Sequence, residues 1–280
     1  MQIPGLTDRQ RASLDRWAPR AALVHDHSWG LVQTTVLELD DPHHGRVILK
    51  AGGPEDHHLA RELRAHRDWL QPWVRTGHAP QLLAADEGAK LLMTRFLPGR
   101  LVEGDPAQDA PDTYRQAGEL LARFHSQHAQ PSSNWNRRLA QRALSWLERP
   151  HRIDAACAAA LRAEVRTWPE RGEVALVPTH GDWQPRNWLV DDGTVRLIDF
   201  GRTALRPAVE DLARLARQDF ARDASLERAF LTGYGEDPRD AGLWRRTLVS
   251  EAIGTAVWAY GVGDEPFEQV GLRQISRLLG

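Results

Sequence analysis

Cysteine is nearly absent from this sequence, and lysine is scarce. The chain contains one cysteine, Cys157, and only two lysines among 36 Lys and Arg residues. A single cysteine excludes an internal disulfide and fits a reducing compartment, so we expect a cytoplasmic protein. No apolar run approaches the ~20 residues of a membrane-spanning helix, and the first five residues lack a signal-peptide pattern. We therefore expect no association with a membrane.

Charge of one sign is also missing. The net charge is -2 and the pI is about 6.6. This balance gives no electrostatic reason to expect binding to nucleic acid or to acidic membranes. A chain of 280 residues, 41% of them hydrophobic, can form one large domain or two lobes with an ample core. The composition agrees with a soluble enzyme and favours no particular oligomeric state.

Strand patterns fill the first third of the chain, and helical patterns fill the rest. A capping box at Thr7-Asp8-Arg9-Gln10 predicts a first helix that reaches about Trp17. Further strands are expected over residues 21–24, 31–39, 47–50, 81–85 and 90–94. Later helices are expected over residues 113–125, 137–147, 155–165, 209–220, 226–231 and 243–260. This order predicts an α+β architecture, with its boundary in the Gly-, Pro- and Asp-rich stretch from Leu97 to Asp112.

A hairpin signal lies near residue 190. Two short apolar runs, Trp188–Val190 and Val195–Ile198, are joined by four residues that include Asp-Gly. Asp-Gly between such runs strongly favours a tight hairpin. Pairing of the strands would bring Asn187, at the start of one, close to Asp199, at the end of the other. A carboxylate and a carboxamide oxygen that face one point suit a hard cation such as Mg²⁺, which also keeps phosphate and water ligands.

The spacing of polar residues around this hairpin predicts a reaction. Asp182 precedes Asn187 by five residues within His-Gly-Asp-Trp-Gln-Pro-Arg-Asn, and Asp199 begins Asp-Phe-Gly twelve residues later. Protein kinases place a catalytic Asp, an Asn five residues on and an Asp-Phe-Gly in this order. We therefore predict a magnesium-nucleotide phosphotransferase in which Asp182 accepts the proton of the acceptor hydroxyl. A surface loop with chance acidic residues is the alternative.

Lys50 ends a strand-like run that starts at Arg46, although nearly every other basic residue of the chain is Arg. A compact ammonium acts as a point charge on nucleotide phosphates, and Arg is not an equivalent substitute. Glu62 lies at the edge of the apolar stripe of an expected helix over residues 58–70, where a carboxylate needs a partner. We predict that Glu62 pairs with Lys50, with Glu55 as a less favoured partner. An exposed lysine and a solvated glutamate are the alternatives.

The sequence resembles the aminoglycoside phosphotransferase and choline kinase family, a branch of the protein kinase-like fold with small-molecule acceptors. His180-Gly181-Asp182, Leu121–His125 and Glu210–Ala213 carry this resemblance. It implies a two-lobed α+β fold, with a small N-terminal β-sheet lobe over residues 1–97. A larger, mainly helical lobe would then span residues 98–280. His180 would orient the catalytic loop, and Asp211, within the third segment, would be a structural hydrogen-bonding residue.

The resemblance also implies how a nucleotide binds. A hinge between the lobes would bond the purine through its backbone and sandwich it with apolar side chains; it includes Met93, Thr94, Arg95 and Phe96. Lys50, set by Glu62, would hold the α and β phosphates, and Asn187 with Asp199 would hold Mg²⁺. No Gly-rich phosphate loop is visible. The first hairpin offers only His27-Ser28-Trp29-Gly30, so Ser28 is a weaker candidate for covering the phosphates.

Three positions depart from the family pattern. Gln184 and Arg186 stand where the family commonly has His and Gly, and Leu205-Arg206-Pro207 replaces a Gly-Asp-Pro. Arg186 either meets the γ-phosphate as a cation or caps the loop from outside, and both interpretations stay open. Loss of the acidic residue weakens any transfer of acceptor specificity from the family.

The implied reaction moves the γ-phosphoryl group of ATP or GTP to a hydroxyl of a small molecule, with an antibiotic as the expected acceptor. Resistance or producer self-protection would be its role. Residues 201–280 hold twelve Asp and Glu but eleven Arg, which is not the acidic half that a polycationic aminoglycoside favours. Trp244, Trp258 and Tyr260 would stack on a ring-bearing acceptor, such as a nucleoside-type antibiotic, unless they are core residues.

Two other functions compete with this prediction. One is a metabolic kinase that acts on choline, homoserine or a sugar. The other is a pseudokinase that binds nucleotide without catalysis, which the missing Gly-rich loop supports and the intact Asp182, Asn187 and Asp199 oppose.

Paired histidines suggest a metal site, but their chemistry argues against one. The pairs are His25 and His27, His43 and His44, and His57 and His58. Adjacent histidines in a turn rarely present both rings to one ion, and no cysteine or carboxylate spacing completes a structural zinc site. We interpret these residues as solvent-facing parts of loops.

Overall fold

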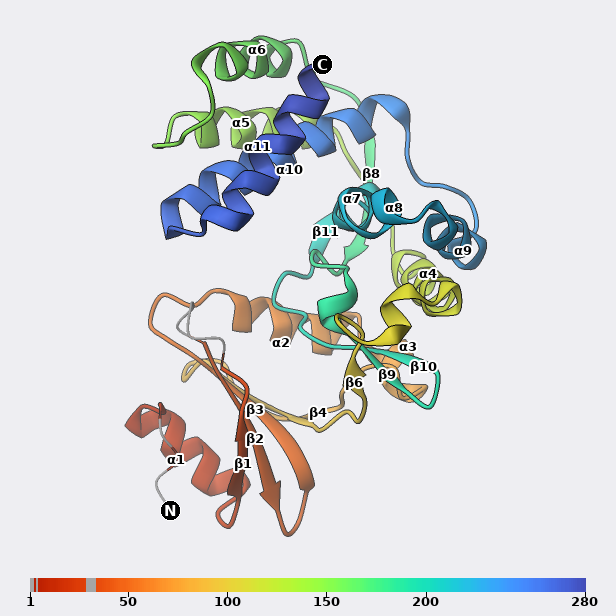
Figure 1. Cartoon of the computed structure of the whole chain (residues 1–280). Helices are drawn as coiled ribbons and strands as arrows, with labels where there is room; N and C mark the ends of the chain where they lie inside the picture. The colour runs from red at the N-terminus through yellow and green to blue at the C-terminus, as the bar shows by residue number, and fades with distance from the viewer. Residues whose placement is uncertain (1–2, 4, 29–33) are drawn as a thin grey trace. The chain divides into compact units, whose positions relative to one another are not determined.

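The structure is a computed structural model that describes residues 3, 5–28 and 34–280 (Figure 1). The contacts divide the chain into two compact units, each built from separate segments. The first unit comprises Met1–Gln127, His180–Ala204 and Arg228–Gly235. The second unit comprises His128–Thr179, Leu205–Glu227 and Glu236–Gly280. The expected lobe boundary after residue 97 stays a prediction.

A five-stranded antiparallel sheet dominates the first part of the first unit. Its strand order is β1-β2-β3-β5-β4. The strands are β1 (Ala22–Asp26), β2 (Thr34–Asp41), β3 (Gly45–Gly52), β4 (Leu82–Asp86) and β5 (Leu91–Arg95). Strands β2 and β3 pair over their whole length, with Val36 opposite Lys50, and β3 then pairs β5, with Lys50 opposite Leu92. Lys50 therefore lies in the interior of a continuous sheet.

Two helices cover the faces of this sheet (Figure 1). Helix α1 (Asp8–Trp17) packs Leu14 against one face, in a buried cluster that includes Leu49 and Met93. Because side chains alternate along a strand, Lys50 points to the other face, where it meets helix α2 (His58–Asp68). The predicted capping box at the start of α1 is present, since Thr7 and Gln10 cap each other's backbone N–H groups.

The predicted hairpin forms β9 (Trp188–Asp191) and β10 (Thr194–Leu197), and β6 (Arg100–Leu101) pairs β9 on its other side. Its turn contains Asp192 at φ +47° and Gly193 at φ +74°. Two positive φ angles define the mirror-image turn that matches the twist of paired strands, and Asp-Gly is favoured there. The prediction of this hairpin from the local sequence was therefore correct.

Helices α4 (Pro111–His125) and α9 (Ala224–Tyr234) meet at glycines in the first unit. A Cβ atom on Gly118 would lie 2.1 Å from the Phe230 carbonyl oxygen, and one on Gly233 would lie 1.9 Å from the Arg115 carbonyl oxygen. Each helix therefore needs glycine where the other backbone passes, even though glycine in a helix costs about 1 kcal/mol relative to alanine. The short helix α3 (Gln71–Arg75) joins this region, because the Trp73 indole N–H donates to the Leu120 carbonyl at 3.1 Å.

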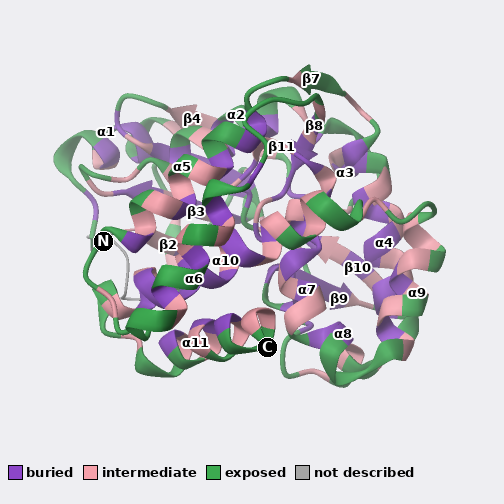
Figure 2. Cartoon of the chain, turned by 90° about the horizontal axis from the view of Figure 1, so that it is seen from above, coloured by how far each residue is buried: buried purple, intermediate pink, exposed green. Residues whose placement is uncertain are grey.

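The second unit is mainly helical. Its principal helices are α5 (Trp135–Leu147), α6 (Ala155–Arg166), α10 (Ala241–Val262) and α11 (Glu265–Leu279). They share a buried cluster that includes Leu147, Leu161 and Ile253, and Figure 2 shows buried residues along much of α10. Gly271 of α11 passes the backbone of α10 closely, since a Cβ atom there would lie 2.4 Å from the Ala256 nitrogen.

Shorter elements complete the chain. They are the strands β7 (Gln130–Ser132), β8 (Val174–Thr179) and β11 (Ala204–Arg206), the helices α7 (Ala213–Arg217) and α8 (Asp219–Arg222), and the single turns η1 (Pro106–Asp109), η2 (Pro185–Asn187) and η3 (Ala208–Asp211). The three strands form a small sheet of order β11-β8-β7. The predicted continuous helix over residues 209–220 was wrong, because η3, α7 and α8 replace it and Gln218 has non-helical backbone angles.

The predicted α+β class is confirmed, with a sheet in the N-terminal region and helices in the C-terminal region. Helix α11 and strands β7 and β8 were not predicted. The expected strand over residues 31–39 begins at Thr34 in the part of the chain that the structure describes, and residues 31–33 lie outside that part. Within residues 3, 5–28 and 34–280, no helix combines the length and apolarity that crossing a bilayer requires.

Candidate active site

Lys50 connects three parts of the first unit. Its ammonium lies 2.8 Å and 3.0 Å from the two carboxylate oxygens of Glu62, and 3.6 Å from Asp199 Oδ1. The side chains of Lys50 and Glu62 are 15% and 6% exposed, whereas that of Asp199 is 53% exposed. The structure therefore contains the predicted ion pair between Lys50 and Glu62. It adds a carboxylate, Asp199, that shares the same ammonium and still faces outward.

Electrostatics keep this cluster ionised. Burial on its own would lower the pKa of Lys50, but the carboxylates of Glu62 and Asp199 outweigh it and hold that pKa above its usual value. Burial opposes ionisation of Asp199, yet the Lys50 ammonium, together with a backbone hydrogen bond from Gly201, holds the pKa of that carboxyl below its usual range. The cluster thus offers a fixed cation beside a partly exposed anion, which is what a metal-bound polyphosphate requires.

Asp199 has a left-handed backbone, with φ +64°. This conformation costs a non-glycine residue about 1 kcal/mol or more, so neighbouring contacts must hold it. The next residue, Phe200, is fully buried and packs against the rings of His66 and His180, with centroids 5.8 Å and 5.2 Å away. His58 hydrogen-bonds through Nδ1 to the Gly201 carbonyl at 3.0 Å. Contacts on both sides therefore fix the direction of the Asp199 carboxylate.

The loop that carries Asp182 folds back on its own carboxylate. Asp182 is 2% exposed, and its Oδ1 accepts a hydrogen bond from Gln184 Nε2 at 2.5 Å. The turn η2 brings Arg186 back over the loop, so its Nη2 donates to Asp182 Oδ2 at 2.7 Å. Each carboxylate oxygen of Asp182 therefore has a donor from the same loop. Both interpretations of Arg186 therefore stay predictions, since its exposed side chain bonds to Asp182 across the loop.

His180 is fully buried beneath this loop. Its Nε2 lies 3.1 Å from the Ile198 carbonyl oxygen, and its Nδ1 accepts from the Asp182 backbone N–H at 3.3 Å. The carbonyl can only accept and the N–H can only donate, so the two partners assign the proton to Nε2. His180 thus links the Asp182 loop to β10, in agreement with an orienting role.

Asn187 joins the loop to the hairpin. Its Nδ2 donates to the Asp182 carbonyl at 2.8 Å, and its own carbonyl accepts from the Ile198 N–H at 3.0 Å. The second bond extends the β9–β10 ladder by one pair and brings Asn187 and Asp199 to the same end of the hairpin. Since its nitrogen is engaged, the amide oxygen of Asn187 is the atom left to bind a ligand.

The donor set that this hairpin end presents is one carboxylate and one carboxamide oxygen. In the described part of the chain, no three His, Cys, Asp or Glu residues gather in a metal-binding group. Two oxygen donors alone would not retain a cation firmly, but they fit Mg²⁺ when phosphates and water supply its other ligands. The chemistry of Asn187 and Asp199 therefore fits a metal that arrives with a nucleotide.

Comparison with protein families decides the identity of this arrangement. A family model described as the phosphotransferase enzyme family, APH, matches residues 27–246. The chain belongs to this family. The predicted enzyme class, a small-molecule kinase, is confirmed by this match. A comparison with curated protein sequences gave no match.

Solved structures share the fold of this phosphotransferase at low identity. A thermostable mutant of aminoglycoside phosphotransferase APH(4)-Ia, in a ternary complex with ADP and hygromycin B, is 13% identical with a TM-score of 0.73, and the alignment covers 98% of both chains. A macrolide 2'-phosphotransferase type I is 16% identical with a TM-score of 0.62, over 98% of this chain and 99% of the other. A choline/ethanolamine kinase family protein from Mesorhizobium loti is 17% identical with a TM-score of 0.65, over 97% and 94%. These likenesses confirm the predicted protein kinase-like fold.

The predicted hinge of the phosphotransferase lies at the end of β5. Met93 is fully buried in the cluster on the α1 face, so only its backbone is available to a ligand on the Lys50 face. Thr94 is paired with Ile48, two residues from Lys50, and lies on the Lys50 face. The backbone N–H groups of Arg95 and Phe96 already donate to the Gln81 and Arg46 carbonyls, at 2.8 Å and 3.0 Å.

Ser28 of the phosphotransferase is held within the β1–β2 hairpin. Its hydroxyl oxygen accepts from the Val36 N–H at 3.0 Å, and its N–H donates to Asp26 Oδ1 at 2.9 Å. No contact within the described residues links Ser28 to Lys50. Trp29 and Gly30, the other candidates in this turn, lie outside the described residues.

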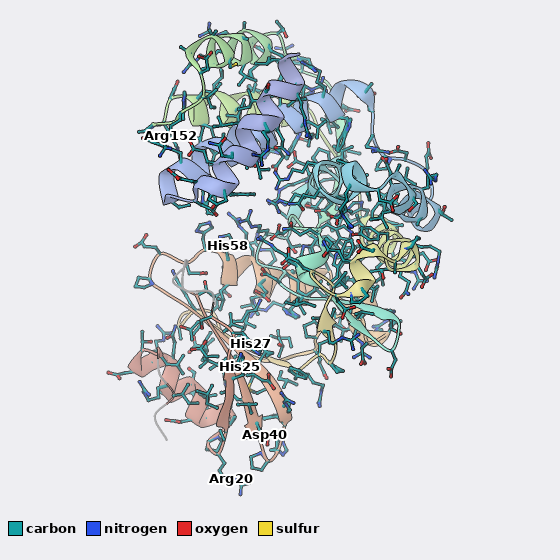
Figure 3. All side chains as sticks on the ribbon, in the orientation of Figure 1. Arg20, His25, His27, Asp40, His58 and Arg152 are labelled. Carbon is teal, nitrogen blue, oxygen red and sulfur yellow. The ribbon has the colours of Figure 1, made fainter. Side chains whose placement is uncertain are left out.

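The paired histidines of the phosphotransferase lie close together without forming a larger cluster. Figure 3 labels His25 and His27, whose ring centroids are 4.5 Å apart. His27 Nε2 lies 3.1 Å from the Glu38 carboxylate, and His58 serves the Gly201 carbonyl described above. Sequence reasoning missed this role of His58 and the contact of Gln184 with Asp182, because neither follows from spacing along one element.

Proposed function

We propose that this phosphotransferase moves the γ-phosphoryl group of ATP to a hydroxyl of a small molecule, with Mg²⁺ as cofactor. The observation that carries the proposal is the shared ammonium of Lys50, which joins Glu62 and Asp199 in one cluster beside the hairpin end. Phosphoryl transfer proceeds through a loose transition state, so catalysis consists mainly of positioning and charge neutralisation. A fixed cation, an ionised carboxylate and a buried acid–base group supply both.

Each residue then has a definite task. Lys50 binds the α and β phosphates, and Glu62 keeps its ammonium in place. Asn187 and Asp199 would hold Mg²⁺ through their side-chain oxygens; the ion, when bound, neutralises charge on the phosphates. Asp182 orients the acceptor hydroxyl and takes its proton late in the transfer.

An acceptor hydroxyl has to approach one of the two Asp182 carboxylate oxygens, each of which already accepts a donor from the loop. Gln184 is only 6% exposed, whereas the side chain of Arg186 is 41% exposed. Arg186 is therefore the partner that an acceptor hydroxyl replaces, at Oδ2. The positive charge of Arg186 also acts on Asp199. We therefore propose that an Arg186 side chain released from Asp182 turns toward Asp199 and meets the transferred phosphoryl group.

The purine would be bound at the hinge that includes Met93, Thr94, Arg95 and Phe96. The N–H groups of Arg95 and Phe96 already donate to backbone carbonyls, so the purine needs the next free N–H donor along the chain. The Leu97 N–H has no hydrogen-bond partner among the described residues, so we propose it as the purine-binding donor. ADP and AMP-PNP in solved structures of the related fold support an adenine nucleotide, and GTP is the alternative donor.

The acceptor class is supported by the neighbours' printed ligands and names. Hygromycin B is bound in one, and a second is a macrolide 2'-phosphotransferase, so we propose an antibiotic-like hydroxylated acceptor. A metabolic acceptor such as choline is the second candidate, because a choline/ethanolamine kinase family protein also shares the fold, with a TM-score of 0.65. We further propose a cytoplasmic enzyme with a nucleotide lobe over residues 1–97 and an acceptor lobe over residues 98–280.

A direct assay tests the reaction. The purified protein is incubated with Mg²⁺ and ATP against hydroxylated antibiotics and metabolites, and mass spectrometry detects phosphorylated products. Asp182→Asn is the negative control. Asp192→Asn is the matched control, since it makes the same change in the exposed hairpin turn and asparagine also accepts a positive φ. Product from wild type and Asp192→Asn alone supports the proposal, whereas equal product from Asp182→Asn refutes the role of Asp182.

A further inference from the structure

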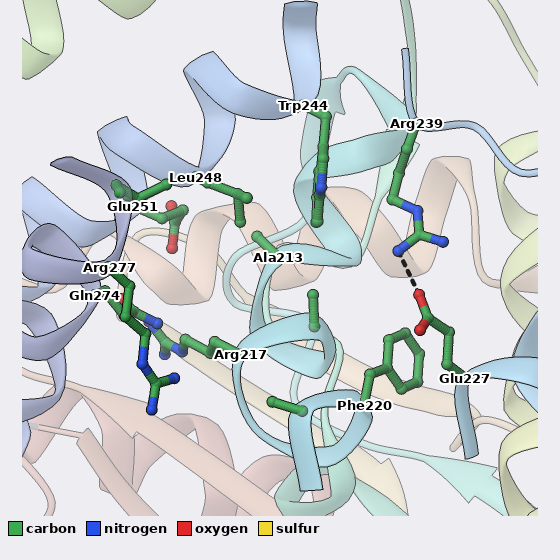
Figure 4. Close-up of a pocket in the computed structure, with 13 residues that line it drawn as sticks. Ala213, Arg217, Phe220, Glu227, Arg239, Trp244, Leu248, Glu251, Gln274 and Arg277 are labelled. Atoms are coloured by element: carbon green, nitrogen blue, oxygen red, sulfur yellow. Dashed lines mark hydrogen bonds and ion pairs between the residues drawn. The ribbon is translucent and has the colours of Figure 1, made fainter. Parts of the chain in front are cut away.

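The second unit contains a cavity of about 400 Å³ (Figure 4). Helices α7, α8, α10 and α11 contribute to its lining, together with Glu227 and Arg239 from neighbouring segments. Its polar and aromatic lining residues have not been used by the proposed reaction. The chemistry of these side chains restricts what the cavity can bind.

Positive charge exceeds negative charge in the lining, with three arginines against two glutamates. One arginine, Arg239, is neutralised within the protein, because its guanidinium lies 2.5 Å from Glu227 and 2.6 Å from Asp237. Arg277 differs from it. Within the described residues, the exposed side chain of Arg277 has no hydrogen bond or ion pair, although it lines the cavity from α11. An anion in the cavity would supply the partner that the protein does not.

A second polar group in the cavity is also unmatched. The side-chain oxygen Oε1 of Gln274, one turn before Arg277 on α11, is buried and has no hydrogen-bond donor among the described residues. A buried acceptor without a donor carries a desolvation penalty that no bond within the protein offsets. A hydroxyl group of a ligand would satisfy it. Figure 4 shows Gln274 and Arg277 together on one side of the cavity.

Aromatic side chains line the other side of the view in Figure 4, where Trp244 and Phe220 are labelled. The Arg239 guanidinium lies 5.6 Å from the centre of the Trp244 ring, and its ion pairs hold it there. Trp244, on α10, is therefore held in place by Arg239, a cation that is itself fixed by its ion pairs. An indole ring presented in this way favours a flat ring as its partner.

We propose that this cavity binds a ring-bearing, hydroxylated small molecule with one anionic group, a carboxylate or a phosphate. The anion would pair with Arg277, a hydroxyl would donate to Gln274 Oε1, and the ring would lie against Trp244. A polycationic aminoglycoside would instead bring its ammonium groups to a lining with surplus arginine.

Matched glycosides test the ligand class by isothermal titration calorimetry. Phenyl β-D-glucuronide and phenyl β-D-glucoside differ only in a carboxylate, and phenyl β-D-glucosaminide carries an amine. We expect the glucuronide to bind wild type about tenfold more tightly than the glucoside, because one charge-assisted hydrogen bond is gained at a partly exposed site. The glucosaminide should bind most weakly.

Two variants on α11 locate the effect. Arg277→Gln should abolish the preference for the glucuronide, whereas Arg273→Gln should retain it, since Arg273 is exposed and does not line the cavity. Equal binding of the three glycosides, no binding of the glucuronide, or equal losses in both variants would overturn the proposal.

Discussion

The Lys50 cluster and the cavity of the second unit treat charge in opposite ways. In the cluster, Lys50, Glu62 and Asp199 are paired with one another before any ligand binds. In the cavity, Arg277 and the Gln274 oxygen lack partners among the described residues. Phosphate chemistry is the same for every substrate, so its machinery can be organised in advance. Recognition of one ligand by the cavity is completed only by that ligand, because unmet polar groups penalise the wrong molecule.

The largest expected effect breaks the organised side of this contrast at Asp182. Asp182→Asn removes the proton acceptor but keeps the shape of the side chain, so turnover should fall by about two to four orders of magnitude. Nucleotide binding should persist, because Asp182 does not contact Lys50 in any described interaction. Steady-state kinetics and nucleotide titration measure the two quantities. A variant with wild-type turnover would remove Asp182 from the mechanism.

Removing Lys50 tests whether Lys50 and Glu62 stabilise the folded protein as an ion pair. Lys50→Met leaves Glu62 buried without its cation, and loss of one member of a buried pair costs about 3 kcal/mol or more of unfolding free energy. The double variant Lys50→Met, Glu62→Gln should recover much of that stability but not nucleotide binding. Denaturant unfolding and nucleotide titration separate these outcomes. If Glu62→Gln restored no stability, the two side chains would not act as a pair.

Arg186 sharpens the contrast. It is paired with Asp182 before a ligand binds, and we propose that it contacts the phosphoryl group during transfer. Arg186→Gln should lower kcat about a hundredfold, the scale of one lost transition-state donor. KM for the nucleotide should change little. Arg196→Gln is the matched control, since Arg196 pairs with Asp191 on the neighbouring hairpin. An unchanged or increased kcat in Arg186→Gln would show that Arg186 only obstructs Asp182.

The smallest expected effect concerns His66, which packs on Phe200 behind the cluster. Burial, and then the charge of Lys50, lower the pKa of His66 to about 4. The unfolded chain, with a histidine pKa near 6.5, binds the proton more readily, so stability is complete at high pH and declines as pH falls below that value. Between pH 7 and pH 5 the loss should be about 2 kcal/mol. His66→Leu, compared with wild type by urea unfolding at both pH values, should lack this contribution.

Local signals predicted the parts of the site that depend on neighbours in sequence. The Asp-Gly turn determined the hairpin, and helical spacing placed Glu62 on the side that meets Lys50. The contacts of Gln184 and Arg186 with Asp182 were beyond such reasoning, because η2 is a single turn whose side-chain directions come from tertiary packing.

Other misses have similar causes. Two signals mark the start of helix α11: the Asp264 side chain caps the Phe267 N–H, and a proline lies in the first turn. These signals were overlooked because they follow closely on α10. Strand β7 consists of Gln-Pro-Ser, which has no strand propensity, and it is a strand only because β8 lies beside it. Likewise, Trp244 lines the cavity whereas Trp258 packs on Phe267, a difference that sequence spacing does not contain.

The scarcity of lysine makes the site unusually simple to address by chemical labelling. Lys90 has a left-handed backbone and its ammonium is engaged by the Pro54 and Asp56 carbonyls. Lys50 is the other ε-amine of the chain. A nucleotide that carries an amine-reactive acyl phosphate would therefore meet a single ε-amine at the cluster. The fraction of labelled chain, measured by mass spectrometry, then gives the fraction of occupied nucleotide sites. Background from surface amines is almost absent, because Lys90 is the other lysine of the chain.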